Sequence, residues 1–483
     1  MNGPPTLLPS GTANGDANGD AGSEGAGAAG GWHGTDPGGT TRSRVGGIGD
    51  PGTLLFAGPP SGAGGDGLDV HLRTWGGLPA RDGADVRALL RSSGLDGRGG
   101  GGFPLARKVE TARFAGGRPV VVVNAGESEP ASRKDRALCA ERPHLVLDGA
   151  ALLVAALGAE EAVLHLHRSP GAPGVPGIPA PALEYAITER RRRGLPDPRW
   201  RLSAGPDRYV SGEASAVASF VDGGEARPLF TTVPLAVEGP SGRPTVVSNA
   251  ETVAHLAVLA RIGPDAWASS GVPSSPGPRL VTVTGATARP GRVFELTGAA
   301  TVGDVLHADG HPAPPAAVLV GGFAGTWVRG DEAWQTPFSR DALRCVDAAP
   351  GCGLLGVLPH GACGLAETAR IVRYLAGESA GQCGTCVAGL PRLADACDAL
   401  AAGTLRRRGV HRMAALGETV LGSGACGHPD GVIRLIRSTL AVFEDDVAGH
   451  VAGHPCRGSD HPPVFSVPAP ARTVGRDDTR EWT

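Results

Sequence analysis

The sequence predicts an α/β domain, followed by a smaller mixed module and a helical bundle. Helical and short β-branched segments alternate between residues 67 and 275, strands and turns fill 276–345, and four helical segments occupy 346–452. Alternation of strands with helices is typical of a layered α/β domain, whereas successive helices with short links indicate a bundle. At 483 residues the chain is also too long for one ordinary core.

The two ends of the chain are expected to be loose. Residues 1–66 contain glycine-rich stretches such as GSEGAGAAGG and almost no apolar periodicity, and 453–483 are rich in proline and arginine. Segments that cannot bury enough apolar surface stay disordered. We therefore predict a disordered arm over 1–66, an ordered protein that begins near Leu68, and a flexible tail over 453–483.

The first domain is predicted from its elements in order. Helical patterns cover 84–95 and 103–115, and the second ends at a pair of glycines suited to a helix C-terminus. The run RPVVVVNA that follows is wholly apolar at its centre, as in a parallel strand buried on both faces. A packed helix at 144–159, a strand at 161–167 and a helix at 181–193 continue the alternation.

The remaining segments do not continue the alternation of helices and strands. Residues 279–328 show strands, turns and one short helix, which predicts a small α+β module. Helical patterns then cover 364–379, 390–408, 410–422 and 431–451. These four helices predict the bundle.

Composition excludes several classes of function. The net charge of −3 gives no field that would recruit nucleic acid or an anionic membrane. The chain has no run of eighteen apolar residues and no basic, then apolar N-terminus, so we expect a cytoplasmic protein without direct membrane insertion, peripheral to the inner face of a membrane at most through partners. Nine cysteines, mostly between Cys345 and Cys426, indicate metal or redox chemistry.

Two lysines stand out in this arginine-rich chain. Lys108 and Lys134 are the only lysines, and they lie in adjacent motifs. An ammonium is a compact point charge, whereas a guanidinium is a planar fork. Lysines retained against such an arginine bias therefore predict a binding site.

A glycine loop precedes the first lysine. Residues 97–102 read GRGGGG and satisfy G-x-G-x-x-G, although any glycine run does so. The loop follows a helix rather than a strand and lacks the later acidic residue, which argues against a Rossmann motif. Consecutive glycines still let the backbone approach a flat ring or a phosphate, and Phe103 could stack on a base. A flexible turn and a core phenylalanine are the alternatives.

Polar residues follow the apolar strand where open α/β sheets place their ligands. Asn124, Glu127 and Glu129 come directly after the four valines. Carboxylates there could accept hydrogen bonds from ribose hydroxyls or a carboxamide and would repel an extra phosphate. A solvated acidic turn is the alternative.

These motifs resemble the flavin- and NADH-binding subunit of respiratory complex I, the F-subunit or 51-kDa family, and related diaphorase subunits. The resemblance runs from Leu68 to Val451 and includes DRYVSGEASA (207–216), ARPLF (226–230) and GRPTVVSNAETV (242–253). It implies an FMN/NADH-binding domain over 67–275, a ubiquitin-like soluble-ligand-binding β-grasp (SLBB) module over 276–345 and an iron–sulfur helical domain over 346–452.

The resemblance also implies a role for each matched residue. The FMN pocket would comprise Gly97, Arg98, Gly99, Gly100, Lys108, Asn124, Glu127, Tyr209, Gly212, Glu213 and Asn249. Phe103, Glu129, Arg227 and Phe230 would face NADH. The implied activity moves hydride from NADH to FMN and passes single electrons through an iron–sulfur cluster to a protein or quinone-pathway acceptor, such as an iron–sulfur protein or ferredoxin.

The sequence departs from the family near the dinucleotide. Gly126 stands where the family has aspartate in N-A-D-E, and Ala214 replaces the second glutamate of GEE. Both changes remove negative charge. We expect weaker NADH binding or relaxed discrimination against NADPH.

The cluster motif departs as well. The family's E-S-C-G-x-C-x-x-C reads ESAGQCGTC here, so Ala380 replaces the first ligand while Cys383, Cys386 and the distant Cys426 remain. A [4Fe–4S] cluster normally takes four thiolates. The alternatives are a three-cysteine [4Fe–4S] cluster with water or another residue, a [3Fe–4S] cluster, recruitment of Cys352, Cys363 or Cys397, or no cluster.

Two functions of different classes follow. The first is an NADH dehydrogenase (diaphorase) subunit; the long N-terminal arm and the departures from the respiratory pattern favour a stand-alone or small-complex paralogue over a true respiratory subunit. The second is a non-catalytic paralogue that serves as an assembly or interaction module, which the lost ligand and acids favour. An unrelated zinc or thiol protein is a third reading of the C-x-x-C spacing alone.

Overall fold

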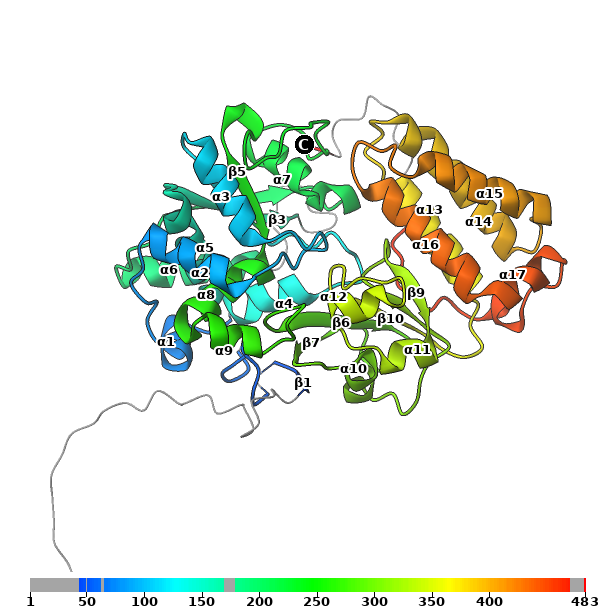
Figure 1. Cartoon of the computed structure of the whole chain (residues 1–483), viewed down its shortest axis with the longest axis horizontal. Helices are drawn as coiled ribbons and strands as arrows, with labels where there is room; N and C mark the ends of the chain where they lie inside the picture. The colour runs from blue at the N-terminus through cyan, green and yellow to red at the C-terminus, as the bar shows by residue number, and fades with distance from the viewer. Residues whose placement is uncertain (1–42, 49, 62–64, 169–178, 470–481) are drawn as a thin grey trace, which may run out of the picture.

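A computed structural model describes residues 43–48, 50–61, 65–168, 179–469 and 482–483. Figure 1 shows three parts: an α/β domain, a mixed sheet with its own short helices lower in the view, and a helical bundle on the right. This arrangement agrees with the predicted mixed α/β fold and helical C-terminal part. Most of the predicted N-terminal arm (1–42) and part of the predicted tail (470–481) lie outside the described residues.

The α/β domain is built on a parallel sheet. Its strands are β2 (Val120–Asn124), β3 (Glu161–His167), β4 (Arg199–Gly205) and β5 (Thr245–Asn249), in the order β4-β3-β2-β5. All three pairings are parallel, and Asn124 lies opposite Asn249. The strand register therefore brings the carboxyl ends of β2 and β5 together.

Helices cover this sheet. They are α1 (Leu68–Trp75), α2 (Gly83–Ser93), α3 (Leu105–Ala115), α4 (Lys134–Glu141), α5 (Pro143–Leu157), α6 (Ala180–Arg192), α7 (Ala214–Val221), α8 (Ala250–Ile262) and α9 (Pro264–Ser269). The buried helices α5 and α8 approach each other closely at Gly149, which has no side chain. A Cβ atom there would lie 1.8 Å from the carbonyl oxygen of Val253. A larger residue there would force the two helices apart.

The second sheet is mixed. Its order is β1-β7-β6-β10-β8-β9, with β1 (Arg44–Gly46), β6 (Arg279–Gly285), β7 (Arg292–Thr297), β8 (Ala317–Val320), β9 (Thr326–Arg329) and β10 (Leu354–Leu358). Only the pairing of β6 with β10 is parallel. The short helices α10 (Val302–Asp309), α11 (Gly330–Gln335) and α12 (Arg340–Arg344) accompany it. The sheet thus exceeds the predicted 276–345 module, taking one strand from each neighbouring region.

The prediction that residues 1–66 form a disordered arm is wrong for 43–48 and 50–61, which the structure describes. Strand β1 pairs with β7, and Leu54, Leu55 and Phe56 are buried. Their three backbone N–H groups donate to the carboxylate of Glu295 at 2.7, 2.9 and 3.0 Å. The glycine-rich composition gave no sign of this order, because only three apolar residues (54–56) and the distant buried carboxylate of Glu295 hold the segment in place.

The bundle comprises α13 (Gly364–Gly377), a π-helical turn (Thr385–Gly389), α14 (Leu390–Ala401), α15 (Arg407–Val420), α16 (His428–Val442) and α17 (Glu444–Val451). The predicted flexible tail is partly packed against it: Phe465 is buried, and Glu367 accepts the N–H of Val464 at 2.9 Å and that of Phe465 at 3.3 Å. None of the helices described here is long and apolar enough to cross a membrane.

Candidate functional site

A cavity of about 570 Å³ lies where the three parts meet. Its wall comes from the glycine loop, the carboxyl ends of β2 and β5, the turn before α7, the β8–β9 connection and the start of α16. The volume falls within the usual range for small-molecule sites. Twelve residues assigned from the sequence line it: Gly97, Gly99, Gly100, Phe103, Lys108, Asn124, Glu127, Glu129, Tyr209, Gly212, Glu213 and Asn249.

The glycine loop offers backbone donors to this cavity. Gly100 and Gly102 have φ values of 106° and 59°, the left-handed region that favours glycine. Among the described residues, the N–H groups of Gly99, Gly100 and Gly101 have no protein acceptor. Helix α3 begins just after the loop. Free amide donors beside a helix N-terminus form an anion cradle, so the loop fits a phosphate.

Lys108 projects from α3 to the edge of β5. Its Nζ donates to the carbonyl oxygen of Val247 at 3.0 Å, and the side chain lines the cavity. Burial lowers the pKa of Lys108, an effect that the charge of Glu213 partly offsets. The negative charge of a bound phosphate would stabilise the charged ammonium and raise the pKa of Lys108 again. The first of the two lysines is therefore placed to bind an anion.

Lys134 has a different role. Its side chain is 1% exposed and forms ion pairs with Asp135 at 2.9 Å and Glu251 at 2.8 Å. Burial lowers its pKa, but these two carboxylates outweigh burial and raise it. Lys134 also lines the cavity, but because its charge is already compensated it joins α4 to α8 in the cavity wall rather than offering a free cation.

Glu129 presents an unsatisfied oxygen. Its Oε2 accepts the N–H of Phe323 at 2.9 Å and the hydroxyl of Tyr209 at 3.4 Å. Its Oε1 is buried and has no hydrogen bond of good geometry within the described part of the chain, although the backbone N–H of Ala131 lies near enough to the carboxylate to lower its pKa. Burial raises the pKa of Glu129 to about 7. An unpaired buried acceptor in a cavity wall fits a ligand hydroxyl or amide.

Glu127 and Glu213 stabilise the wall itself. Glu127 accepts the N–H groups of Asp135 and Arg136 at 3.3 and 3.2 Å, which caps α4, and burial raises its pKa. Glu213 caps α7 by accepting the N–H of Ser215 at 2.8 Å. Both carboxylates therefore shape the cavity through their helices.

The strand-end asparagines fix the cavity floor. Asn124 Nδ2 donates to the carbonyl oxygen of Gly212 at 3.0 Å, tying β2 to the turn before α7. Asn249 caps α8 and donates to Asp135 at 2.8 Å. Their side-chain amides are thus held rigidly at the carboxyl edge of the sheet.

Three assigned residues do not line the cavity. Arg98 is buried behind the glycine loop, where its backbone N–H bonds Thr252 Oγ1 at 2.8 Å and its guanidinium pairs with Asp96. Arg227 lines a second cavity, and Phe230 is 86% exposed. Arg98 therefore anchors the loop from behind instead of touching a ligand in the cavity.

Sequence reasoning missed the partner of Gly126. A Cβ atom at Gly126 would lie 2.6 Å from Cδ2 of the His167 ring, so the ring fills the volume of a larger side chain there. His167 ends β3, and its Nδ1 contacts Asp207 at 3.2 Å. The glycine is thus coupled to the histidine, a pairing between distant positions that no local pattern reveals.

Two side chains of α16 were also missed. His428 is buried against Tyr209, with ring centroids 5.6 Å apart, and burial lowers its pKa to about 4. Arg434 is exposed on the helix and lines the same cavity. Arg434 falls within an ordinary helical pattern, and His428 lies just before the predicted helix of 431–451, so neither gave a signal.

The predicted cluster cysteines lie between two cavities. Cys383 and Cys386 line the second cavity, of about 410 Å³, with Ser379 and Ala380, whereas Cys426 lines the first. The side chains of Cys383 and Cys386 hydrogen-bond; the Cys426 thiol helps to raise the pKa of Cys386, and the Cys383 thiol helps to raise that of Cys426. Three thiols with open volume beside them fit an iron–sulfur group.

These three thiols differ electrostatically. Burial would raise the pKa of Cys383, but backbone N–H groups of Ala425 and Cys386 outweigh it and lower the value. Burial raises the pKa of Cys386 to about 12, although the Ser379 hydroxyl opposes the rise. Cys383 is therefore the readiest of the set to become a thiolate ligand.

None of the three alternative cysteines lines the second cavity. Cys352 lines the first cavity instead, and its Sγ donates to the carbonyl oxygen of Gly321 at 3.3 Å. Cys397 packs on Met413 in the bundle core, and Cys363 contacts His450. Among the described residues, the hydroxyl of Ser379 lies beside Cys386 and that of Thr385 beside Cys383.

An anion cradle on an α/β sheet, next to a group of thiols, defines a flavin- and nucleotide-linked electron-transfer protein. The family model described as the Nuo51 FMN-binding domain matches residues 90–258, and that of the NADH-ubiquinone oxidoreductase-F iron–sulfur binding region matches 366–450. The chain belongs to the F-subunit, or 51-kDa, family of FMN-dependent NADH oxidoreductases.

Individual relatives agree. The chain is 27% identical over 378 residues to the F subunit of the NADH-quinone oxidoreductase of Streptomyces coelicolor, covering 77% of this chain and 84% of the relative. It is 25% identical to the NADP-reducing hydrogenase subunit HndC of Solidesulfovibrio fructosivorans, covering 77% of each. An NAD⁺-reducing [NiFe]-hydrogenase structure superposes with a TM-score of 0.68 at 28% identity, over 77% of this chain and 63% of that chain.

Proposed function

We propose that this chain oxidises NADH with bound FMN and delivers single electrons, through a cluster at Cys383, Cys386 and Cys426, to a separate iron–sulfur protein or ferredoxin. The observation that supports it most is that Cys426 lies in the wall of the cavity that also holds the glycine loop and Glu129. A short path therefore joins the nucleotide site to the thiols.

The residues divide the work of binding. The N–H groups of the glycine loop and the ammonium of Lys108 would hold the FMN phosphate. Asn124 and Asn249 would orient the ring at the sheet edge. When bound, FMN supplies the chemistry that accepts a hydride and releases electrons one at a time.

The dinucleotide would be held on the open side. Phe103 is 48% exposed on the cavity wall and offers a stacking face. Oε1 of Glu129 would accept a hydrogen bond from a ribose hydroxyl, and Arg434 offers a positive charge to the phosphates. No side chain has to act as a general acid or base, because a hydride moves between the two cofactors.

The cluster would be ligated by three thiolates and one other group. Ser379 lies beside Cys386, where a hydroxyl could occupy the position that Ala380 leaves without a thiol. We further assign the six-stranded sheet and its helices to the SLBB-like module, and we place the chain in a small separate assembly rather than in complex I.

The test is NADH-dependent reduction of ferricyanide by the purified protein after anaerobic reconstitution with FMN, iron and sulfide. Turnover that scales with bound FMN supports the proposal. The second candidate, a non-catalytic paralogue, is favoured by Ala380 and Gly126. It predicts a folded protein that retains neither FMN nor activity after the same treatment.

The nucleotide preference belongs to the same experiment. Gly126 and Ala214 leave the dinucleotide region with less negative charge than the family pattern, so we expect NADPH to be used within about tenfold of NADH, a difference of about 1.4 kcal/mol. A strong preference for NADH would contradict relaxed discrimination and leave the proposed activity intact.

A further inference from the structure

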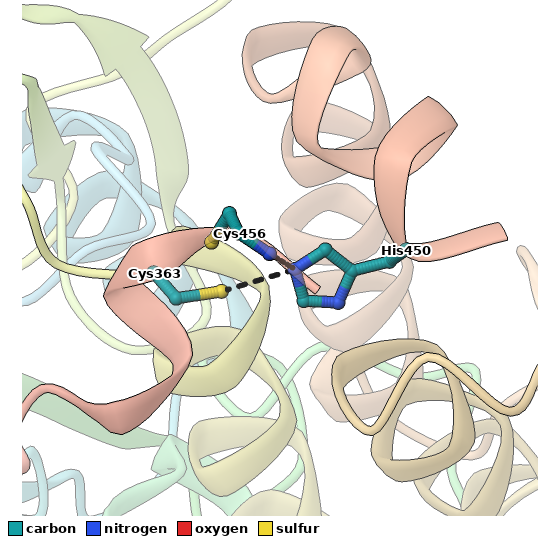
Figure 2. A group of neighbouring side chains, drawn as sticks. All are labelled: Cys363, His450 and Cys456. Carbon is teal, nitrogen blue, oxygen red and sulfur yellow. Dashed lines mark hydrogen bonds between the residues drawn. The ribbon is translucent and has the colours of Figure 1, made fainter. Parts of the chain in front are cut away.

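Two cysteines and a histidine from separate segments meet in the bundle, away from both cavities described above. Cys363 precedes α13, His450 lies in the last turn of α17, and Cys456 follows six residues later. Their Sγ, Nε2 and Sγ atoms all lie within 4.8 Å of one another (Figure 2). Cys363 and Cys456 fall outside the matched iron–sulfur region.

The histidine is oriented as a metal ligand. His450 is fully buried, and its Nδ1–H donates to the carbonyl oxygen of Leu400 at 3.0 Å. This bond fixes the tautomer in which Nε2 carries the lone pair, the usual arrangement of a metal-bound histidine. Nε2 points at Cys363 Sγ, as Figure 2 shows.

The spacing matches a tetrahedral ion. Zinc–sulfur and zinc–nitrogen bonds of about 2.3 and 2.0 Å at a tetrahedral angle place the two ligand atoms about 3.5 Å apart. Cys363 Sγ and His450 Nε2 are 3.8 Å apart. Without an ion, Nε2 accepts the N–H of Cys456 at 2.9 Å, a bond that a small movement of the turn before Cys456 would exchange for a metal bond.

The environment of Cys363 suits a thiolate bound to a cation. Its Sγ accepts the N–H of Ala366 at 3.4 Å at the N-terminus of the 14-residue helix α13. Burial and the neighbouring Cys456 thiol otherwise raise the pKa of Cys363 to about 12. A bound cation deprotonates such a thiol outright, so metal uptake would release protons.

The three residues also join segments that already pack tightly. A Cβ atom at Gly458 would lie 2.6 Å from the backbone N of Cys363, so the segment after α17 rests directly on the start of α13. Cys456 also lines a surface cavity of about 520 Å³, which leaves room for a solvent ligand.

We propose that Cys363, His450 and Cys456 bind one Zn²⁺ ion, with water in the fourth position, and that the ion fixes the segment after α17 to α13. Two thiolates and an imidazole suit zinc and exclude the hard cations Mg²⁺ and Ca²⁺. This site goes beyond the proposed NADH oxidation and does not depend on it.

The test measures zinc by mass spectrometry in the full chain purified in zinc-containing medium under reducing conditions. Five proteins are compared: wild type, a Cys363→Ser/Cys456→Ser double variant, His450→Ala, a His454→Ala control and a Cys386→Ser variant. His454 is exposed and outside the group. Cys386→Ser detects zinc that has occupied the predicted cluster cysteines instead.

We expect about one zinc per chain in wild type, His454→Ala and Cys386→Ser, and at least a tenfold lower content in the other two variants. Because a buried-site variant could misfold, the second measurement uses wild type alone: a strong chelator should lower its melting temperature, and added Zn²⁺ should restore it. Zinc that is absent from wild type, lost only in Cys386→Ser, or replaced by a Cys363–Cys456 disulfide in peptide maps overturns the proposal.

Discussion

Replacing Glu129 by glutamine is expected to have opposite effects on stability and on dinucleotide binding. In the protein without dinucleotide, burial raises the pKa of this carboxyl from 4.5 to about 7. An acid whose folded pKa is raised costs stability when ionised. The cost is absent below about pH 4.5, where both states are protonated, grows between 4.5 and 7, and is complete above 7.

The magnitude follows from the shift. A change of about 2.5 pKa units corresponds to about 3 kcal/mol at pH 8, taken as an upper bound. The variant Glu129→Gln keeps an oxygen to accept the N–H of Phe323 but cannot ionise. We therefore expect a melting temperature several degrees above wild type at pH 8, and a difference that shrinks towards pH 5.

The same substitution should weaken dinucleotide binding. Gln places an amide donor where Oε1 of Glu129 now offers an acceptor. A hydrogen bond to a charged group contributes about 1.5–3 kcal/mol, so KM for NADH should rise by about 10- to 150-fold. Melting curves at pH 5 and 8 and steady-state kinetics measure both effects.

Glu110→Gln is the matched control, because Glu110 is exposed on α3 and pairs with exposed Arg91. It should change neither quantity. If Glu129→Gln were less stable than wild type at pH 8, or kept KM for NADH within twofold, the reasoning on the buried carboxylate would be wrong.

The remaining predictions concern the lysines, the glycine and the lost thiol. Lys108→Ala should lose FMN on purification while keeping the wild-type melting temperature, whereas Lys134→Ala should destabilise the protein by about 3–5 kcal/mol by leaving two buried carboxylates unpaired; flavin content and melting curves separate them. Gly126→Asp should destabilise the protein, because the new side chain collides with the His167 ring. Adding His167→Ala to Gly126→Asp should restore stability, and the added negative charge should raise the preference for NADH over NADPH; melting curves and kinetics with both nucleotides measure these effects. Ala380→Cys should raise the iron content per chain, and unchanged iron would contradict the assignment of Cys383, Cys386 and Cys426 as ligands.

The sequence was most informative where a signal was local. The wholly apolar valine run predicted a buried parallel strand, and β2 has that place between β3 and β5. The glycine loop and the strand-end residues Asn124 and Glu129 line one cavity because parallel strands end at a common edge. The family of the chain followed from these same motifs.

The rest depended on contacts between distant residues. Glu295 holds residues 54–56 from about 240 positions away, which no composition signal could show. The ion pairs of Lys134 and the contact of Gly126 with His167 are likewise tertiary. His450 and Cys456 lacked any recognisable spacing to Cys363, because their proximity arises only when α17 packs on α14 and its last turn meets the start of α13.

The most direct test of the account is an anaerobic visible and electron paramagnetic resonance spectrum of the reconstituted protein before and after NADH addition. We predict a flavin absorption that bleaches with NADH, together with an iron–sulfur signal whose intensity changes on the same addition and is lost in Cys383→Ser. A protein that stays colourless after reconstitution, or a flavin that NADH leaves oxidised, would contradict the claim that this cavity passes electrons from NADH to the thiol-bound cluster.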